Sequence, residues 1–126
     1  RNSGMTGHRI GADAEVQNSM ITDGCRIHGK VKHSILFAGV SVEPGAVVED
    51  AVVMGDTVIK RGAKVTHCIV AEGVTVGCDA VIGEKPAEDV TGDVATIAPG
   101  VTIGDRAVIG PKAMVYNDVE EGQEQC

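Results

Sequence analysis

The stretch IAPGVTIGDRAVIGPKAMVYNDVE, residues 97–120, repeats every six residues. Each hexad begins with isoleucine or valine and carries a small or aliphatic residue four places later. A period of six is neither the 3.6 of a helix nor the 2 of an alternating strand. It predicts a solenoid in which each hexad forms one short strand and a turn, and three hexads close a triangular coil. Successive coils would stack at about 4.8 Å, the spacing of neighbouring strands.

Four longer phrases extend the repeat toward the N-terminus, and their starts lie 15, 17 and 17 residues apart. They are VQNSMITDG (16–24), VKHSILFAG (31–39), VEDAVVMGD (48–56) and VTHCIVAEG (65–73). The spacing predicts coils of 17 or 18 residues, with the second coil two residues short between Cys25 and Lys30. In each hexad the first and fifth residues should point inward, which places Val31 and Ile35 in the interior.

The repeat predicts one all-β domain with short flanking segments. Residues 10–119 form the β-helix, residues 1–9 lead into it, and residues 120–126 form a polar tail. The segment 83–96 is polar and acidic and lacks the period, so we expect a loop that leaves the coil at a corner. The interior should be narrow, because only 2% of the residues are aromatic and the apolar content is mostly valine, isoleucine and alanine.

Charge and hydropathy exclude several classes of function. The net charge of −7 argues against nucleic acid and anionic membranes as partners, since both select basic clusters. No apolar run approaches the roughly eighteen residues of a membrane span, and no signal peptide is visible. The four cysteines contain no CxxC pair and are expected to be reduced thiols of a cytoplasmic protein. Because the chain opens on Arg1, we expect a piece of a longer protein.

Histidines offer the first candidate site. His33 and His67 take the third place of their phrases, and Asn18 and Asp50 take the same place in the other two. His33 and His67 should lie two coils, about 9.6 Å, apart, which is too far for both to bind one zinc ion. Asp50 lies between them and can pair with either. We interpret this column as exposed polar residues at an outward corner. The remaining histidines, expected on the surface, are His8 and His28.

Neither a nucleophile nor a phosphate loop is indicated. Ser34, Ala51 and Cys68 share one column, so this position selects small side chains for packing rather than a reactive thiol. Cys78 should be more exposed. The glycine turns lack the GxxxxGK[ST] and strand–GxGxxG–helix contexts of phosphate loops. Basic residues of the first half could bind a phosphorylated effector, but such a spread is more often a solvated surface. They are Arg26, Lys30, Lys32, Lys60, Arg61 and Lys64.

Three function classes use such a scaffold. One is acyl transfer by a freestanding trimer, in which a histidine between subunits is the general base. Another is a histidine-bound metal at a trimer interface, as in gamma-class carbonic anhydrases. The third is a non-catalytic domain for assembly and regulation. We assign no catalytic, cofactor-binding or metal-binding residue in this chain, which favours the third class.

Residues 18–83 resemble the C-terminal β-helix domain of bacterial glucose-1-phosphate adenylyltransferases, also called ADP-glucose pyrophosphorylases. The family's pattern begins NS-x-x-x-x-GC-x-x-x-G-x-V-x-x-S-x-L-F-x-G-V, and residues 8–16 and 103–119 are similar to its entry and closing coils. The matching residues are Asn18, Ser19, Gly24, Cys25, Gly29, Val31, Ser34, Leu36, Phe37, Gly39, Val40, Gly45, Ala46 and Met54. Similarity to hexapeptide-repeat proteins also implies a left-handed coil, an exception to right-handed crossovers.

The resemblance implies part of an enzyme that makes ADP-glucose and pyrophosphate from ATP and glucose 1-phosphate for glycogen synthesis. In that family an N-terminal nucleotidyltransferase domain, with Mg²⁺, ATP and a GxGTRLxPLT-type loop, is catalytic. This sequence has no such loop, so the fragment alone is expected to be inactive. The family implies contacts with that catalytic domain, a tetramer, and phosphorylated effectors. A regulatory paralogue and another sugar-nucleotide pyrophosphorylase remain alternatives, and we favour the catalytic subunit.

Overall fold

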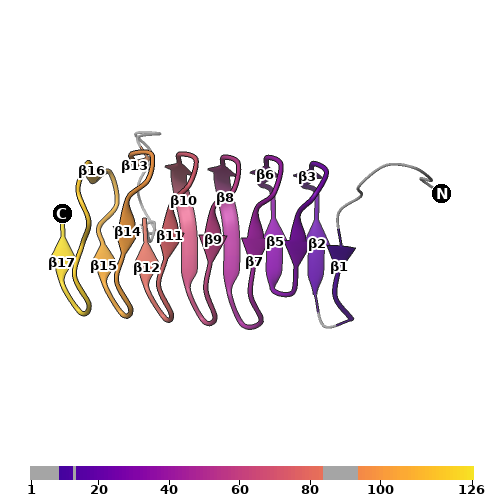
Figure 1. Cartoon of the computed structure of the whole chain (residues 1–126), viewed down its shortest axis with the longest axis horizontal. Coiled ribbons are helices and arrows are strands. Elements are labelled where there is room, and N and C mark those ends of the chain that lie inside the picture. The colour runs from indigo at the N-terminus through magenta and orange to yellow at the C-terminus, as the bar shows by residue number, and fades with distance from the viewer. Residues whose placement is uncertain (1–8, 13, 84–93) are drawn as a thin grey trace.

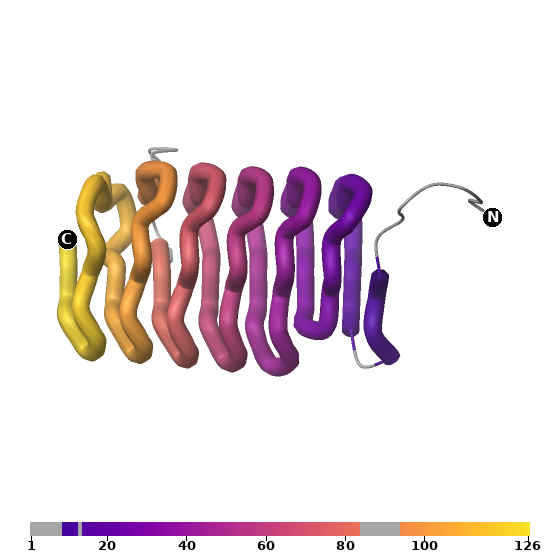
Figure 2. The backbone as a smooth tube through the Cα atoms, in the orientation of Figure 1, coloured from indigo at the N-terminus to yellow at the C-terminus, as the bar shows by residue number. Residues whose placement is uncertain are grey.

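The chain is an all-β, left-handed parallel β-helix, as the hexad period and the resemblance predicted. A computed structural model describes residues 9–12, 14–83 and 94–126, and these contain seventeen strands and no helix. The coils stack side by side along the long axis of the molecule, so the N-terminal and C-terminal coils lie at opposite ends (Figures 1 and 2). The strands pair in parallel, each with its counterpart in the next coil.

The strands form three faces of a prism. The first face is a six-stranded sheet. It contains β1 (Arg9–Ile10), β4 (Arg26–Ile27), β7 (Ser41–Val42), β9 (Val58–Ile59), β11 (Thr75–Val76) and β14 (Thr102–Ile103). The second and third faces belong to one sheet, because two long strands cross the corner between them. These long strands are β8 (Val47–Val53) and β10 (Lys64–Val70).

The other strands of the large sheet lie on one face each. Those of the second face are β2 (Glu15–Gln17), β5 (Lys30–Lys32), β12 (Val81–Ile82), β15 (Val108–Ile109) and β17 (Glu124–Gln125). Those of the third face are β3 (Met20–Ile21), β6 (Ile35–Leu36), β13 (Ala95–Ile97) and β16 (Met114–Val115). The first half of β8 and β10 completes the second face, and the last half completes the third.

The interior is one continuous column of small and aliphatic side chains. In the closing hexads the first and fifth residues are buried, as predicted; they are Ile97, Val101, Ile103, Ala107, Ile109, Ala113, Val115 and Val119. The buried apolar residues are alanine, valine, isoleucine, leucine and cysteine, whereas Phe37 and Tyr116 are exposed. A prism of three short strands has no room for an aromatic ring, which explains the composition.

One inward position was predicted wrongly. Val31 is buried, but Ile35 is 39% exposed and Leu36 is fully buried in its place. The cause is the corner at His33, which joins the second face to the third through one residue instead of two. The inward positions Val31 and Leu36 are therefore five residues apart, and the hexad rule slips by one.

This short corner explains the 17-residue period. From Leu36 the next inward strand residues are Val42 and Val48, each six residues on, and then Val53 follows after only five. Val48 and Val53 sit on either side of Asp50 within the unbroken strand β8. The closing coil has no such corner, and Ile97 pairs with Val115, eighteen residues later.

The second coil is short, as the sequence predicted. Arg26 pairs with Ser41, 15 residues on, whereas Ser41 pairs with Val58, 17 residues on. The missing residues lie in the turn between β4 and β5, which contains Gly29, and this turn does not reach as far as the turns of the other coils (Figure 2). A Cβ atom on Gly29 would collide with the carbonyl oxygen of Ala46 in the next coil, so this tight turn requires glycine.

The flanking segments differ in part from the predicted bounds. Of the predicted loop 83–96, residues 84–93 lie outside the described residues, while 95–97 form β13. Residues 1–8 of the lead-in also lie outside them. The polar tail, 120–126, contains β17, and the amide of Val108 donates to the carbonyl of Gln123 at 2.9 Å. A strand ladder uses backbone groups, so polar side chains do not end the β-helix at residue 119.

Candidate functional site

The polar column at the corner between the second and third faces is the first candidate. Asn18, His33, Asp50 and His67 have φ values of 48°, 47°, 52° and 49°, all in the left-handed region. Among residues with a Cβ atom, asparagine, aspartate and histidine tolerate this conformation best. A corner made of a single residue needs this left-handed conformation, because that one residue must turn the chain from the second face to the third. The backbone therefore accounts for the recurrence of these residue types without any chemistry.

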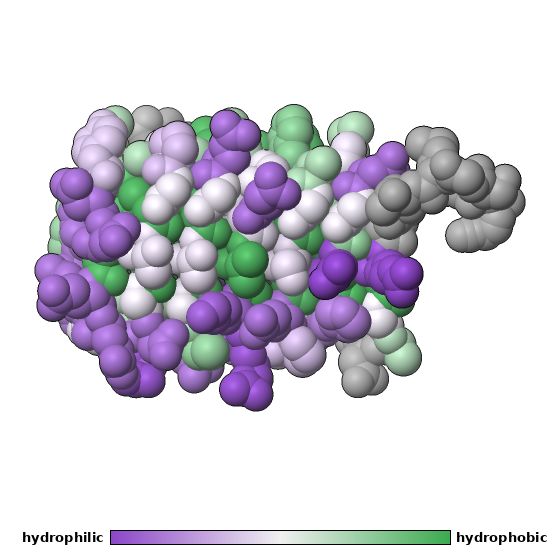
Figure 3. Space-filling view, viewed as in Figure 1, coloured by the Kyte–Doolittle hydropathy of each residue, from purple (hydrophilic) through white to green (hydrophobic). Residues whose placement is uncertain are grey.

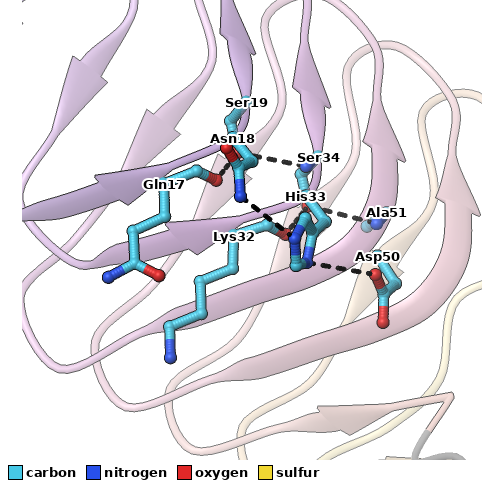
Figure 4. Close-up of polar contacts among 8 residues, drawn as sticks. All are labelled: Gln17, Asn18, Ser19, Lys32, His33, Ser34, Asp50 and Ala51. Atoms are coloured by element: carbon cyan, nitrogen blue, oxygen red, sulfur yellow. Dashed lines mark hydrogen bonds and ion pairs between the residues drawn. The ribbon is translucent and has the colours of Figure 1, made fainter.

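His33 makes side-chain contacts with both of its neighbours in the column (Figure 4). Its Nε2 lies 3.3 Å from Nδ2 of Asn18, and its Nδ1 lies 3.9 Å from Oδ1 of Asp50. The side chains of His33 and Asp50 are 59% and 48% exposed, so water screens the pair and limits its contribution to stability. The predicted outward ladder is confirmed for His33, and Asp50 pairs with this histidine.

Ser34, the residue beside His33, faces the other way. Its hydroxyl donates to the carbonyl of Lys32 at 2.8 Å and accepts from the amide of Ala51 at 3.1 Å. The side chain is only 3% exposed, and Ala51 and Cys68 at the same place are also buried. The prediction that this column selects small residues for packing is confirmed. The hydroxyl is also occupied by two backbone hydrogen bonds and does not contact the imidazole, so His33 and Ser34 do not form a base and nucleophile pair.

His67 and Cys68 repeat this arrangement two coils further on. Burial raises the pKa of the Cys68 thiol to about 12, so the thiolate needed for nucleophilic attack is absent at neutral pH. His67 is half-buried, and its Nε2 is buried without a hydrogen-bond partner among the described residues. Sequence reasoning placed this ring in solvent. The nearby turn at Gly83, where a Cβ atom would touch the carbonyl groups of Thr66 and His67, shows that this corner is more crowded than that of His33.

The other described cysteines, Cys25, Cys78 and Cys126, lie apart from these two columns. Burial also raises the pKa of the Cys25 thiol, which donates to the carbonyl of Phe37 at 3.1 Å. Cys78 is half-buried and Cys126 exposed. Within residues 9–12, 14–83 and 94–126, no group of three histidine, cysteine or acidic side chains could hold a metal ion. His8 lies outside the described residues.

The six basic residues of the prediction do not form one cluster: Lys30, Lys32 and Lys64 lie on the second face, Lys60 and Arg61 lie in the turn after β9, and only Arg26 lies at the N-terminal end of the first face, beside Arg9. Arg9 and Arg26 pair in register, and with Ile10, Gly11 and His28 they line an open pocket of about 600 Å³. Figure 3 looks onto this face and shows one strongly hydrophilic patch at that end. His28 is exposed, as predicted, and its ring occupies the space where a Cβ atom on Gly11 would stand. Two guanidinium groups and an imidazole could bind an anion here.

Among residues 9–12, 14–83 and 94–126 there is no helix long and apolar enough to cross a membrane.

A family model matches most of the chain. The model described as "GlmU-like, C-terminal hexapeptide" covers residues 5–104. Among curated proteins, the glucose-1-phosphate adenylyltransferase of Acetivibrio thermocellus is 41% identical over 76 residues, which are 60% of this chain and 18% of that protein. The enzyme of the same name from Bacillus anthracis is 43% identical over 93 residues, which are 71% of this chain and 23% of that protein. The chain thus spans about a fifth of the length of these relatives.

Solved structures share the fold at lower identity. The acetyltransferase domain of PglB from Neisseria gonorrhoeae superposes with a TM-score of 0.65 at 21% identity, covering 95% of this chain and 54% of that one. WeeI from Acinetobacter baumannii gives a TM-score of 0.51 at 17% identity, covering 91% and 52%. At these identities the likeness concerns the stacked coils alone.

Proposed function

Because the chain belongs to the family of GlmU-like C-terminal hexapeptide domains, we propose that it is the C-terminal domain of a glucose-1-phosphate adenylyltransferase. The observation that carries this proposal is the identity of 41–43% to enzymes of that name. In the proposed parent enzyme, ATP and glucose 1-phosphate give ADP-glucose and pyrophosphate. A nucleotidyltransferase domain that precedes this one supplies the catalytic groups and uses Mg²⁺.

We propose that the domain itself is not catalytic. Three features of the described residues support this. The hydroxyl of Ser34 is held by two backbone hydrogen bonds, the thiol of Cys68 is buried and protonated, and the imidazole of His33 faces solvent. Its role is then assembly and regulation: it packs with the preceding domain, takes part in a homo-oligomer that can include a regulatory paralogue, and contributes to binding of phosphorylated effectors. The parent enzyme is cytoplasmic.

The test compares the 126-residue chain with the longer protein that carries it. Pyrophosphate release from ATP and glucose 1-phosphate, with Mg²⁺, should be measured for both. We expect release by the longer protein and none by the chain alone. The proposal fails if the longer protein releases no pyrophosphate with any sugar phosphate, or if the chain alone is active.

A freestanding acyltransferase is the second candidate, favoured by the fold shared with the PglB domain and by the contact between His33 and Asp50. It requires acetyl-CoA binding by the chain alone, and loss of transfer in His33→Ala. Calorimetric titration of the chain with acetyl-CoA separates the two candidates, since the adenylyltransferase domain should give no binding heat.

A further inference from the structure

The pocket at the N-terminal end of the first face is lined by Arg9, Ile10, Gly11, Arg26 and His28, and we call it the arginine pocket. Arg9 and Arg26 pair in register on the neighbouring strands β1 and β4, so their side chains leave the face about 4.8 Å apart. His28 follows Arg26 by two residues and therefore points to the same side of the chain. Two guanidinium groups and one imidazole thus border a single open space.

The positive charges of the arginine pocket have no carboxylate partner in the described part of the chain. Within residues 9–12, 14–83 and 94–126, no ion pair includes Arg9 or Arg26. The next residue in their row is Ser41, which is neutral. The nearby acid Glu43 accepts a hydrogen bond from the amide of Arg61 at 3.0 Å, so its carboxylate is directed to the following coil. Two like charges side by side on adjacent strands repel each other, and a bound anion would relieve that repulsion.

Glycine at position 11 gives the arginine pocket its shape. A Cβ atom there would lie 2.5 Å from Nδ1 of His28, so the imidazole packs directly on the glycine backbone. This contact keeps the ring beside β1, next to the guanidinium of Arg9. Ile10, which is 47% exposed, adds an apolar wall to the same pocket. The pocket therefore combines donors for an anion with a surface for an organic group.

We propose that the arginine pocket binds the phosphate group of a phosphorylated small molecule, with Arg9 and Arg26 donating from two sides and His28 as a third donor. The planar fork of a guanidinium matches the oxygens of a phosphate, and a phosphate monoester offers three terminal oxygens and close to two negative charges. It can therefore accept from both arginines at once. A carboxylate has two oxygens and one charge, so it satisfies one fork and leaves the second without a partner.

The ligand is a small molecule rather than a nucleic acid. The chain carries a net charge of −7, so a polyanion that extends beyond the pocket would meet a repulsive surface. The pocket has a volume of about 600 Å³, which leaves room for an organic group beside the phosphate. Both observations favour a compact phosphate monoester.

The arginine pocket gives a place on this domain to the phosphorylated effectors of the proposed function, and only its regulatory role rests on that function. Binding to the chain and pyrophosphate release by the longer protein are separate measurements. Loss of release with intact binding would remove the regulatory role and leave the site. Absent binding with intact release would remove the site alone.

Calorimetric titration of the 126-residue chain at an ionic strength of about 50 mM tests the ligand class. The probes are inorganic phosphate and glucose 6-phosphate, a phosphate monoester that the proposed reaction does not use, and sodium acetate is the carboxylate control. We expect saturable binding of glucose 6-phosphate and at least about tenfold weaker binding of acetate. The proposal is overturned if glucose 6-phosphate does not bind at concentrations up to about 10 mM, or if acetate binds as tightly.

Substitution of the arginines tests the location. Arg9→Gln and Arg26→Gln each remove one fork from the pocket, and each should raise the dissociation constant for glucose 6-phosphate at least about tenfold. The matched control is Arg61→Gln, which removes the same charge from the turn after β9 and should change that constant less than about twofold. Thermal unfolding followed by circular dichroism shows that the three variants fold. If Arg61→Gln weakens binding as much as Arg26→Gln, the attraction is a general effect of charge and the arginine pocket is not the site.

Discussion

The corners between the second and third faces differ between the first coils and the last. In the first coils a single residue with positive φ turns the chain, as Asp50 does inside β8 and His67 inside β10. In the last coil, the turn between Ile109 and Val115 takes one residue more, and Lys112 has the positive φ. The difference of one residue changes the coil from 17 to 18 residues. A corner residue thus sets the repeat length of this solenoid, and His33 and His67 are two such corner residues.

The largest effect is expected when a short corner is lengthened. Insertion of one glycine after Asp50 would give this coil a longer corner than the coils on both sides of it, so Ala51 and Val53 can no longer keep their pairing with those coils and their place in the core together. Val53 is fully buried at the centre of the stack. We expect the central coils to unfold at 25 °C, with a loss of at least about 4 kcal/mol in the free energy of unfolding. Urea denaturation followed by circular dichroism measures this.

The matched control is Asp50→Gly, which keeps the length of the corner and its backbone conformation. It should change the free energy of unfolding by less than about 1 kcal/mol. If the insertion and the substitution cost the same, the corner does not set the register.

The free energy of unfolding should depend on pH through Cys68, which follows the corner at His67. The Cys68 pKa is about 12 in the folded chain, against 9.0 for a free thiol, because the side chain is buried. The folded state therefore binds this proton more tightly, and its contribution to stability is complete below about pH 9 and is lost as the pH rises toward 12. The loss should reach about 4 kcal/mol by pH 12.

Urea denaturation at intervals from pH 8 to pH 12 measures the alkaline loss. Cys68→Ala, which copies Ala51 of the same column, removes the titrating group and leaves the other alkaline titrations in place. Equal slopes for the parent chain and Cys68→Ala would contradict the assignment.

Ser34, the inward residue after the corner at His33, should contribute to the free energy of unfolding through its hydrogen bonds. Ser34→Ala leaves the buried amide of Ala51 without the hydroxyl that accepts it at 3.1 Å. We expect a loss of about 1–2 kcal/mol in the free energy of unfolding, the cost of an unpaired buried donor. Ser19→Ala removes the same kind of acceptor from the amide of Ser34 in a half-buried place, and it should cost less. A larger loss for Ser19→Ala would refute this explanation.

Substitutions of His33 test whether the left-handed backbone conformation explains which residue types occupy this corner. His33→Val puts a β-branched side chain at φ 47°, and the free energy of unfolding should fall by about 1 kcal/mol or more. His33→Asn copies Asn18 of the same column and should stay within about 0.5 kcal/mol of the parent chain. Thermal unfolding of the two variants side by side decides the point. If both lose the same stability, the imidazole is needed for itself and the conformational explanation is wrong.

The sequence predicted the solenoid because the small and aliphatic residues that fill the core recur with the period of the coils. Val31, Leu36 and Ile59 are fully buried, and no other arrangement repeats such positions at six and seventeen residues. It failed at Ile35 because an outward isoleucine and an inward one look alike in a pattern that counts only hydrophobic residues. The polar column was recognised as a corner, but its positive φ values became apparent only from the backbone, since Asn, His and Asp also occur on ordinary surfaces.

The smallest effect should come from the contact between His33 and Asp50. At 3.9 Å, with both side chains about half exposed, the pair gains little over its hydration, and Asp50→Asn should change the free energy of unfolding by less than about 0.5 kcal/mol. Asparagine also tolerates the left-handed backbone, so the corner itself is preserved. A double-mutant cycle with His33→Asn isolates the contact from the conformational term. A coupling energy above about 1 kcal/mol would mean that the imidazole and carboxylate act as a unit, and the acyltransferase reading of this corner would gain support.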